Sequence, residues 1–311
     1  MSSGERPSPF RRFAPPSLSP AGEREGAHRE SDGKGEGRRG LDRRALLVNL
    51  AMWALGLFAI APLAWMVSVS LMQPGEAAHF PPPLLPHHPT VQNYVTLFAT
   101  TDMARFFLNS LLLATLATLI STTFNVMAGY AFAKLDFRGR DALFRWLLAA
   151  LVIPAQVAMI PLFLLCKELG LVNTYAGVLV PSIATVFGIF LVRQYALSIP
   201  DDLLEAARID GAGEWRIFRS IALPALTPML VTLATFAFLA SWSDFLWPLI
   251  ILNDTDRQTL PVALANLARE HVQDFELMMA GAVVTLAPVL LIFLVLQRYY
   301  LSGLLAGSVK G

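Results

Sequence analysis

Six apolar segments, each long enough to cross a lipid bilayer, constrain this chain more than any other feature. They lie at 45–71, 106–132, 143–165, 173–195, 225–252 and 277–299. A helix of about 20 apolar residues spans the hydrocarbon core, and the backbone polar groups there must be paired within the chain. None of the segments shows the alternating pattern of a membrane β-strand. The sequence therefore predicts an all-α integral membrane protein with six transmembrane helices.

Composition agrees with this class. Hydrophobic residues make up 55% of the 311 positions and charged residues 15%, which is far from the composition of a soluble domain. Several apolar segments contain proline, which neighbouring helices and waters accommodate inside a membrane. With a net charge of +1, the chain carries no general basic surface, and we expect no nucleic-acid partner.

Residues 1–44 differ from the rest of the chain. They contain ten Lys or Arg and seven Asp or Glu residues among Pro, Ser and Gly. Such a segment cannot bury a hydrophobic core, so we expect a disordered tail followed by a transmembrane domain at 45–311.

Basic residues at the ends of the apolar segments predict the orientation. The flanks 29–44, 134–145, 193–219 and 298–310 together hold sixteen Lys and Arg residues. The opposite flanks hold four, namely Arg105, Lys167, Arg257 and Arg269. Because cytoplasmic loops carry the excess of positive charge, we expect both termini and the loop at 198–224 to be cytoplasmic.

Motifs of catalytic sites are missing from the sequence. It has no GxxxxGK[ST] phosphate loop, no HExxH, no CxxC and no GxSxG. Adjacent His87 and His88 have no Cys or carboxylate pattern around them, and the single Cys166 has no partner for an internal disulfide. We therefore expect neither an enzyme nor a bound cofactor or metal in this chain.

The loop at 198–224 is charged and amphipathic. Ser198 is expected to cap a helix whose first turn contains Pro200, and the sequence GAG at 211–213 is expected to end that helix. A second short helix follows, and Pro224 opens the next apolar segment. Two helices lying on the membrane surface would explain this pattern.

The same loop resembles the signature loop of ATP-binding-cassette importer permeases. The pattern is Glu-Ala-Ala, three residues, Gly, nine residues, Ile, one residue, Leu-Pro. It is matched without departure by Glu205, Ala206, Ala207, Gly211, Ile221, Leu223 and Pro224. The resemblance implies that these residues, together with Asp210, form the coupling helix that docks on a separate ATPase subunit.

The resemblance extends from about residue 45 to the end of the chain. Asn109-Ser110, WSDFLWP at 242–248, TLP at 259–261 and GLLAGSVKG at 303–311 look like carbohydrate-importer permeases, in particular the second six-span subunit of maltose-type transporters. Many relatives have Asn where Ser243 stands. The resemblance implies sugar transport by alternating access across a bacterial inner membrane. The implied partners are a cytosolic ATPase dimer, a second and different permease subunit, an extracytoplasmic solute-binding protein and membrane lipid.

Asp244 is the one acidic residue well inside an apolar segment. A charge there costs at least about 2.5 kcal/mol, which favours a functional role, although a carboxylate that packs helices together gives the same pattern. With the resemblance, this indicates a substrate path that includes Asn109, Trp242, Ser243 and Asp244. Because every Lys and Arg after residue 44 lies at or beyond the edge of a segment, we expect a neutral oligosaccharide or polyol. An ion-coupled secondary transporter is the alternative, and it would use the carboxylate as an ion relay.

Overall fold

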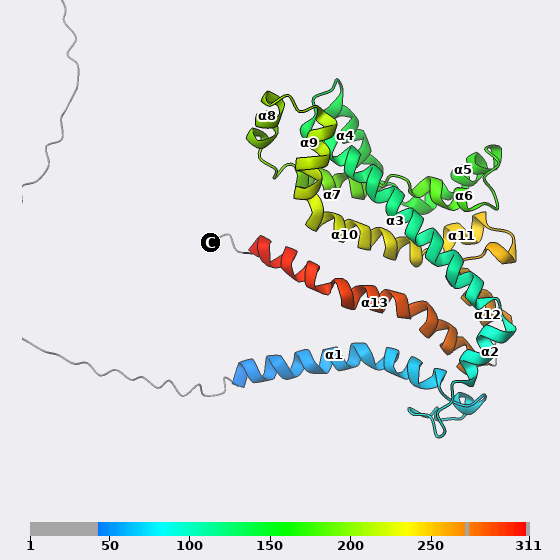
Figure 1. Ribbon diagram of the computed structural model, residues 1–311. Helices are drawn as coiled ribbons and strands as arrows, with labels where there is room; N and C mark the ends of the chain where they lie inside the picture. Colours follow the sequence, from blue (N-terminus) through cyan, green and yellow to red (C-terminus); the bar gives the residue numbers. More distant parts are fainter. Residues whose placement is uncertain (1–42, 271–273, 309–311) are drawn as a thin grey trace, which may run out of the picture. The chain divides into compact units, whose positions relative to one another are not determined.

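The computed structural model describes residues 43–270 and 274–308 of the chain (Figure 1). Its contacts divide the chain into two units, Met1–Trp53 and Ala54–Gly311. The described part of the first unit is the beginning of helix α1, which starts at Arg43. The expected disordered tail at 1–44 therefore lies outside the described residues, except for its last two positions.

The described residues form helices, turns and loops, and no strand occurs among them. The helices are α1 (Arg43–Ser70), α2 (Gln92–Thr100), α3 (Met103–Lys134), α4 (Arg140–Ala149), α5 (Ala155–Glu168), α6 (Tyr175–Leu179), α7 (Val186–Ala196), α8 (Asp201–Ile209), α9 (Glu214–Ile217), α10 (Leu223–Trp242), α11 (Leu246–Ile251), α12 (Leu260–Glu270) and α13 (Phe275–Ser308). Short 3-10 turns η1 (Glu76–Ala78), η2 (Ala150–Val152), η3 (Val180–Ser182) and η5 (Thr255–Arg257), and a widened π turn η4 (Phe218–Ala222), join some of them. The predicted all-α fold is confirmed.

Four helical stretches are long and apolar enough to cross a membrane without interruption: Arg44–Ser70, Met103–Lys134, Glu214–Trp242 and Phe275–Gln297. Two further stretches qualify only as bent pairs. Arg140–Val152 and Ala155–Glu168 meet at 106°, whereas Tyr175–Ser182 and Val186–Ala196 meet at 41°. The number of spans is therefore four to six, and a count of six remains a prediction.

The sharper bend interrupts the predicted segment at 143–165. Ile153 has an extended backbone, which is the conformation that a residue before proline prefers, and Pro154 has no N–H to continue a helix. The predicted segment at 143–165 is therefore broken at this proline into two helical pieces.

The second bend is held by a side chain from another helix. Thr185 is the N-cap of α7, and its backbone N–H donates to the Asn125 Oδ1 of α3 over 2.8 Å. The Asn125 Nδ2 donates in turn to the hydroxyls of Thr185 (3.1 Å) and Ser121 (3.0 Å). Gly188 lies against this amide so closely that a Cβ would collide with it. An amide from α3 thus satisfies backbone that the broken helix leaves unpaired.

The predicted segment at 225–252 is also interrupted, because α10 ends at Trp242 and α11 begins at Leu246. Asp244 therefore lies in a short non-helical turn between two helices. Its Oδ1 accepts a long contact of 3.5 Å from the backbone N–H of Trp247 at the start of α11. A carboxylate in this position compensates unpaired donors at a helix start.

The second unit is organised around α3. This helix packs most extensively against α10 and α7, and α2 and α12 pack against α13. By contrast, the apolar side chains of α1 from Leu46 to Ile60 are exposed in the single chain. A helix that is apolar on all sides and uncovered fits a lipid environment.

The proline-rich loop after α1 is closed by Glu76. Its carboxylate accepts the backbone N–H groups of Gln73 (3.0 Å) and His87 (2.7 Å) and contacts the His87 Nδ1 at 2.6 Å. These hydrogen bonds lower the pKa of Glu76 from 4.5 to about 2.

Among the described residues, no group of three or more His, Cys, Asp or Glu side chains is arranged to hold a metal ion.

Candidate functional sites

The start of α8 is anchored to the end of α3 by a buried lysine. The Lys134 ammonium, only 4% exposed, donates 2.6 Å hydrogen bonds to the Ile199 carbonyl and to the Asp201 Oδ1. Pro200 occupies the N-cap position of α8. The expected capping by Ser198 is wrong, because its hydroxyl donates back to the Tyr195 carbonyl and not to α8.

The end of α8 explains the spacing within the signature loop. Gly211 adopts the left-handed conformation at φ 82°, directly after the last helical turn. Its N–H donates to the Arg208 carbonyl, and the Ala212 N–H donates to the Ala207 carbonyl, both over 3.0 Å. These two bonds define a Schellman turn, in which the residue four positions after the first acceptor needs a positive φ. The separation of Ala207 from Gly211 is therefore a local backbone requirement.

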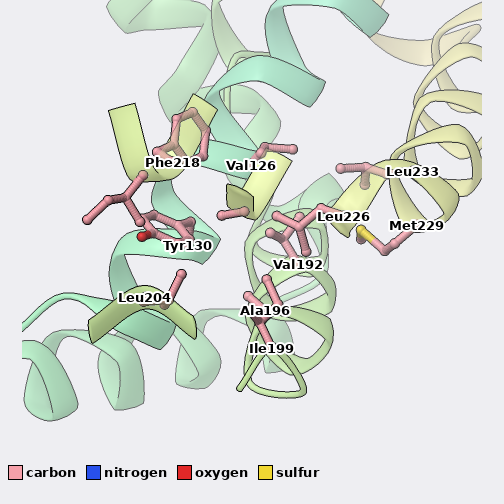
Figure 2. Close-up of a cluster of buried hydrophobic side chains, with 12 residues drawn as sticks. Val126, Tyr130, Val192, Ala196, Ile199, Leu204, Phe218, Leu226, Met229 and Leu233 are labelled. Carbon is pink, nitrogen blue, oxygen red and sulfur yellow. The ribbon is translucent and has the colours of Figure 1, made fainter. Parts of the chain in front are cut away.

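The two faces of α8 have different surroundings. Leu204 is buried, and Ala207 and Ala212 pack against the same core cluster, as do Ile221 and Leu223. Figure 2 shows Leu204 and Phe218 near Tyr130 of α3, with Val192 and Ala196 of α7 in the same cluster. The opposite face exposes Glu205, Ala206 and Asp210. Two large apolar side chains are also exposed, Ile209 of α8 at 86% and Trp215 of α9 at 64%.

The chain turns from α8 into a continuous helical stretch. The Arg208 guanidinium pairs with the Glu214 carboxylate through contacts of 2.7 and 3.3 Å, and this pairing raises the pKa of Arg208. The widened turn η4 then runs directly into Leu223 and Pro224. Pro224 has no N–H for the preceding turn, which a local π geometry accommodates. The expected separate second helix is thus the beginning of the stretch Glu214–Trp242.

A cavity of about 330 Å³ lies between α3, the α6–α7 bend, α10 and α11. This volume is in the range of small-molecule sites, which is about 300–1,000 Å³. Its polar lining consists of Ser110, Ser121, Asn125, Ser182, Thr185, Ser241, Asp244 and Thr259. The other lining residues are apolar, so hydroxyls, one amide and one carboxylate provide the polar contacts.

These polar groups differ in how far they are already paired. Ser121, Asn125 and Thr185 bond one another. In contrast, the hydroxyl of Thr259, a residue that is 4% exposed, has no hydrogen-bond partner in the described part of the chain. The Asp244 carboxylate accepts from the backbone N–H groups of Trp247, over a long 3.5 Å, and of Leu246. Thr259 and Asp244 therefore keep hydrogen-bonding capacity for a ligand in the cavity.

Of the four residues expected on a substrate path, only Asp244 lines this cavity. Asn109 is buried, and its amide bonds the carbonyls of Asp256 and Gln258. Trp242 is 2% exposed and donates to the Thr285 carbonyl over 3.0 Å. Ser243 is exposed at the end of α10. For these three residues, a contact with substrate stays a prediction that the cavity does not support.

Sequence reasoning gave no role to three residues that the structure places at these sites. Thr259 stands in one of the stretches that carry the resemblance, and Lys134 contributes one charge to the predicted orientation. Asn125 is a polar residue within the apolar segment 106–132. A signal existed for Asn125, because a side-chain amide within an apolar helix must find partners. No comparable pattern indicated that Lys134 would be buried.

The described helices, the cavity among them and the exposed amphipathic segment define a membrane-embedded permease. The chain belongs to the family described as the binding-protein-dependent transport system inner membrane component, whose model matches residues 121–304. This confirms the resemblance to importer permeases and decides against an ion-coupled secondary transporter.

Among its relatives is the arabinooligosaccharides transport system permease protein AraQ of Halalkalibacterium halodurans, 37% identical over 272 residues, which cover 85% of this chain and 96% of the relative. The diacetylchitobiose uptake system permease protein NgcG of Streptomyces coelicolor is 33% identical, over 86% of this chain and 89% of the relative. The lactose transport system permease protein LacG of Rhizobium radiobacter is 34% identical, over 70% and 80%.

Among solved structures, the chain is similar to one from a bacterial ABC transporter involved in the import of the acidic polysaccharide alginate. The TM-score is 0.75 at 24% identity, over 83% of this chain and 97% of the other. At this identity the likeness shows the fold alone. A further structure, with a TM-score of 0.59 at 17% identity, is of a bacterial alginate transporter in complex with an alginate pentasaccharide-bound periplasmic protein.

Proposed function

We propose that this chain is one permease subunit of an ATP-driven sugar importer and that its substrate is a neutral oligosaccharide or a related polyol. The observation that carries the proposal is the agreement between relatives and cavity. The three relatives are named for arabinooligosaccharides, diacetylchitobiose and lactose. The cavity in turn is lined by hydroxyl, amide and carboxylate groups, which suit sugar hydroxyls.

The charge of the cavity favours a neutral substrate. No Lys or Arg is among the residues that line it, and Asp244 supplies a carboxylate with no ion-pair partner in the described part of the chain. A carboxylated or phosphorylated substrate would meet like charge without a cation to compensate it. A sugar hydroxyl can instead donate to Asp244.

The exposed face of α8 supports a cytosolic ATPase dimer as the partner that drives transport. Ile209 of α8 and Trp215 of the following α9 offer apolar contact area, and Glu205 and Asp210 offer charge. ATP-driven closure of the ATPase shifts the permease equilibrium only by its differential affinity for the two permease conformations. A second permease subunit, an extracytoplasmic binding protein and lipid complete the proposed assembly, and ATP hydrolysis takes place on the separate chain.

We expect α8 to face the cytoplasm and the segments 72–91 and 252–270 to face outward in the inner membrane. Cysteines introduced by His88→Cys and Ala268→Cys should react with an impermeant thiol reagent added outside intact cells, whereas Gly213→Cys should react only after the cells are opened. All three positions are exposed, so accessibility within the fold does not decide the result. Reaction of Gly213→Cys in intact cells would reverse the proposed orientation.

Substrate contacts in the cavity predict a second result. Thr259→Val and Asp244→Asn are each expected to lower the uptake rate about fivefold to tenfold, because a hydrogen bond to substrate is worth roughly 0.5–3 kcal/mol. Thr235→Val is the matched control, since Thr235 is 3% exposed but bonds the Val231 carbonyl and lies outside the cavity lining. Uptake by initial-rate measurement should stay within about twofold of the parent for this control. Equal rates in all four proteins would exclude the cavity from the substrate path.

The proposed function itself is tested in a strain from which this chain is deleted. Uptake of radiolabelled arabino-oligosaccharides, chito-oligosaccharides and lactose is compared in the deleted and the complemented strain, with oligomers of alginate as the acidic counterpart. We expect at least one neutral sugar to depend on the chain and the acidic oligomers not to depend on it. Dependence of the acidic oligomers alone would overturn the neutral-substrate proposal.

A further inference from the structure

The segment 252–259, named the strap here, joins α11 to α12 and borders the cavity at its last residue. Thr259 at its end lines the cavity, as does Pro248 just before its start. Apart from the short turn η5, the strap has no regular secondary structure that would pair its backbone. Some of its backbone groups bond one another or the adjacent helices, and four others are paired with side chains from two other parts of the chain.

The first set of contacts comes from α3. The Asn109 Nδ2 donates to the carbonyls of Asp256 (2.9 Å) and Gln258 (3.0 Å). The Asn109 Oδ1 accepts a 2.7 Å bond from the Tyr175 hydroxyl, which fixes the orientation of the amide. One residue further on, the Ser110 Oγ accepts the Leu260 N–H over 2.7 Å. Thr259 is therefore placed between two anchored stretches of backbone.

The second set comes from the turn between α5 and α6. The Asn173 Oδ1 accepts the N–H groups of Asn253 and Asp254, both over 3.0 Å. Its backbone N–H donates to the Ile251 carbonyl over 2.7 Å, and its carbonyl accepts from the Arg257 guanidinium. Asn173 holds these partners with a φ of 60°, which Asn tolerates better than most residues. Both ends of the strap are thus bound by asparagine side chains.

The strap lies at the opposite end of the long helices from α8. Asn109 and Lys134 are 25 residues apart on α3, which corresponds to roughly 37 Å along an α-helix. Likewise, α8 and η4 precede the first residue of α10, whereas the strap follows its last residue and α11 (Figure 1). The strap therefore borders the cavity on the side away from the proposed ATPase contact.

We propose that Asn109 and Asn173 are positioning residues that latch the strap over the cavity, and that release of their hydrogen bonds opens the cavity to the outer side. The proposal rests on the proposed function for its orientation and for the role of the cavity. Side-chain bonds to loop backbone suit a latch, because each can be exchanged for bonds to water at small net cost. Asn109 thereby acts on transport through the strap and not through contact with substrate.

The test measures access to the cavity from outside. The reporter is a cysteine introduced by Ala237→Cys, at a cavity-lining position, in a Cys166→Ala background that removes the native thiol. Right-side-out membrane vesicles carrying the complete importer are treated with a sulfonated maleimide, and the rate of modification is measured. We expect Asn109→Leu and Asn173→Gly each to raise this rate about tenfold. Asn173→Gly keeps the positive φ and removes only the side chain.

Asn93→Leu is the matched control for a general loosening of the fold. Asn93 is 4% exposed, and its Nδ2 also bonds two backbone carbonyls, those of Ser70 (2.9 Å) and Met72 (2.8 Å), in a different loop. Its modification rate should match that of the parent. If Asn109→Leu does not accumulate in the membrane, Asn109→Asp replaces it, because that variant keeps the acceptor for Tyr175 and loses the donor to the strap.

Two outcomes would overturn the latch: parental modification rates in the Asn109 and Asn173 variants, or an equal increase in the Asn93 variant. Failure of the proposed function is seen separately, as a parent importer that takes up no neutral oligosaccharide while its modification rates still respond to the latch variants.

Discussion

Gly211→Val is expected to lower uptake at least tenfold without preventing insertion of the protein into the membrane. Gly211 has a φ of 82° and closes the Schellman turn that ends α8. A β-branched residue is strained in this conformation by about 1–2 kcal/mol or more, so the turn opens and α8 loses its fixed position. Initial rates of sugar uptake, with immunoblots of the membrane fraction, measure the two effects separately.

The same turn provides a matched control. Gly213 is also exposed, and a Cβ at either glycine would meet no atom within 4 Å. Its φ is −74°, however, which any residue adopts. Gly213→Val should therefore leave uptake within about twofold of the parent, and Gly211→Asn should be intermediate, because Asn tolerates a positive φ. Equal uptake by the two valine variants would show that the left-handed turn is not required.

Glu205→Lys tests whether the negative charge on the exposed face of α8 contributes to binding of the ATPase. Glu205 is exposed, so the substitution leaves the core cluster beneath α8 intact. If this face binds the ATPase, the variant should lose co-purification of the ATPase subunit together with uptake, whereas Glu205→Gln should retain most of both. An intact complex with normal uptake in Glu205→Lys would exclude Glu205 from the contact.

Lys134→Met is expected to lower uptake about tenfold and to increase the ATP hydrolysed per sugar transported by the assembled importer. The substitution keeps an unbranched apolar stem in a site where the side chain is 4% exposed. It removes both hydrogen bonds that hold the beginning of α8 to the end of α3. Movement of α8 is then transmitted less completely to the long helices. ATPase and transport rates in liposomes measure the ratio directly.

Arg138→Met is the control for the loss of a positive charge nearby, because Arg138 is exposed and should tolerate the change. The hydrogen bond from Lys134 lowers the pKa of Asp201 below its ordinary value of 3.8. Because the folded-state pKa is the lower one, the pair contributes stability above about pH 4 and loses it as the pH falls through the lowered pKa. Between pH 6 and 8 the Asp201 carboxyl therefore does not titrate, and transport in that range should not change through this group. An unchanged ratio of ATP to sugar in Lys134→Met would show that the anchor does not transmit movement.

The sequence by itself determined the class of the protein and the local structure of its signature loop. Apolar segments of this length span a bilayer, and a helix pairs all the backbone polar groups of such a segment within the segment itself. Within the loop, Ala207 and Gly211 have the separation that a Schellman turn requires, so interactions within a few residues determine the end of α8. Where the interactions that determine a structure lie within a few residues of one another, the sequence pattern is sufficient to predict that structure.

Tertiary structure alone decided where the helices break and which polar residues remain free. Asn109 and Asp244 are both polar residues in apolar segments, and nothing local distinguishes them. The Asn109 amide donates to two backbone carbonyls about 150 positions later in the chain. The Asp244 carboxylate, in contrast, lines the cavity and can still accept further hydrogen bonds there. A buried polar group takes whichever partner the folded chain brings to it. That partner is defined only by packing between helices far apart in sequence. For this reason the sequence indicated one of the residues that line the cavity, Asp244, and did not indicate the strap.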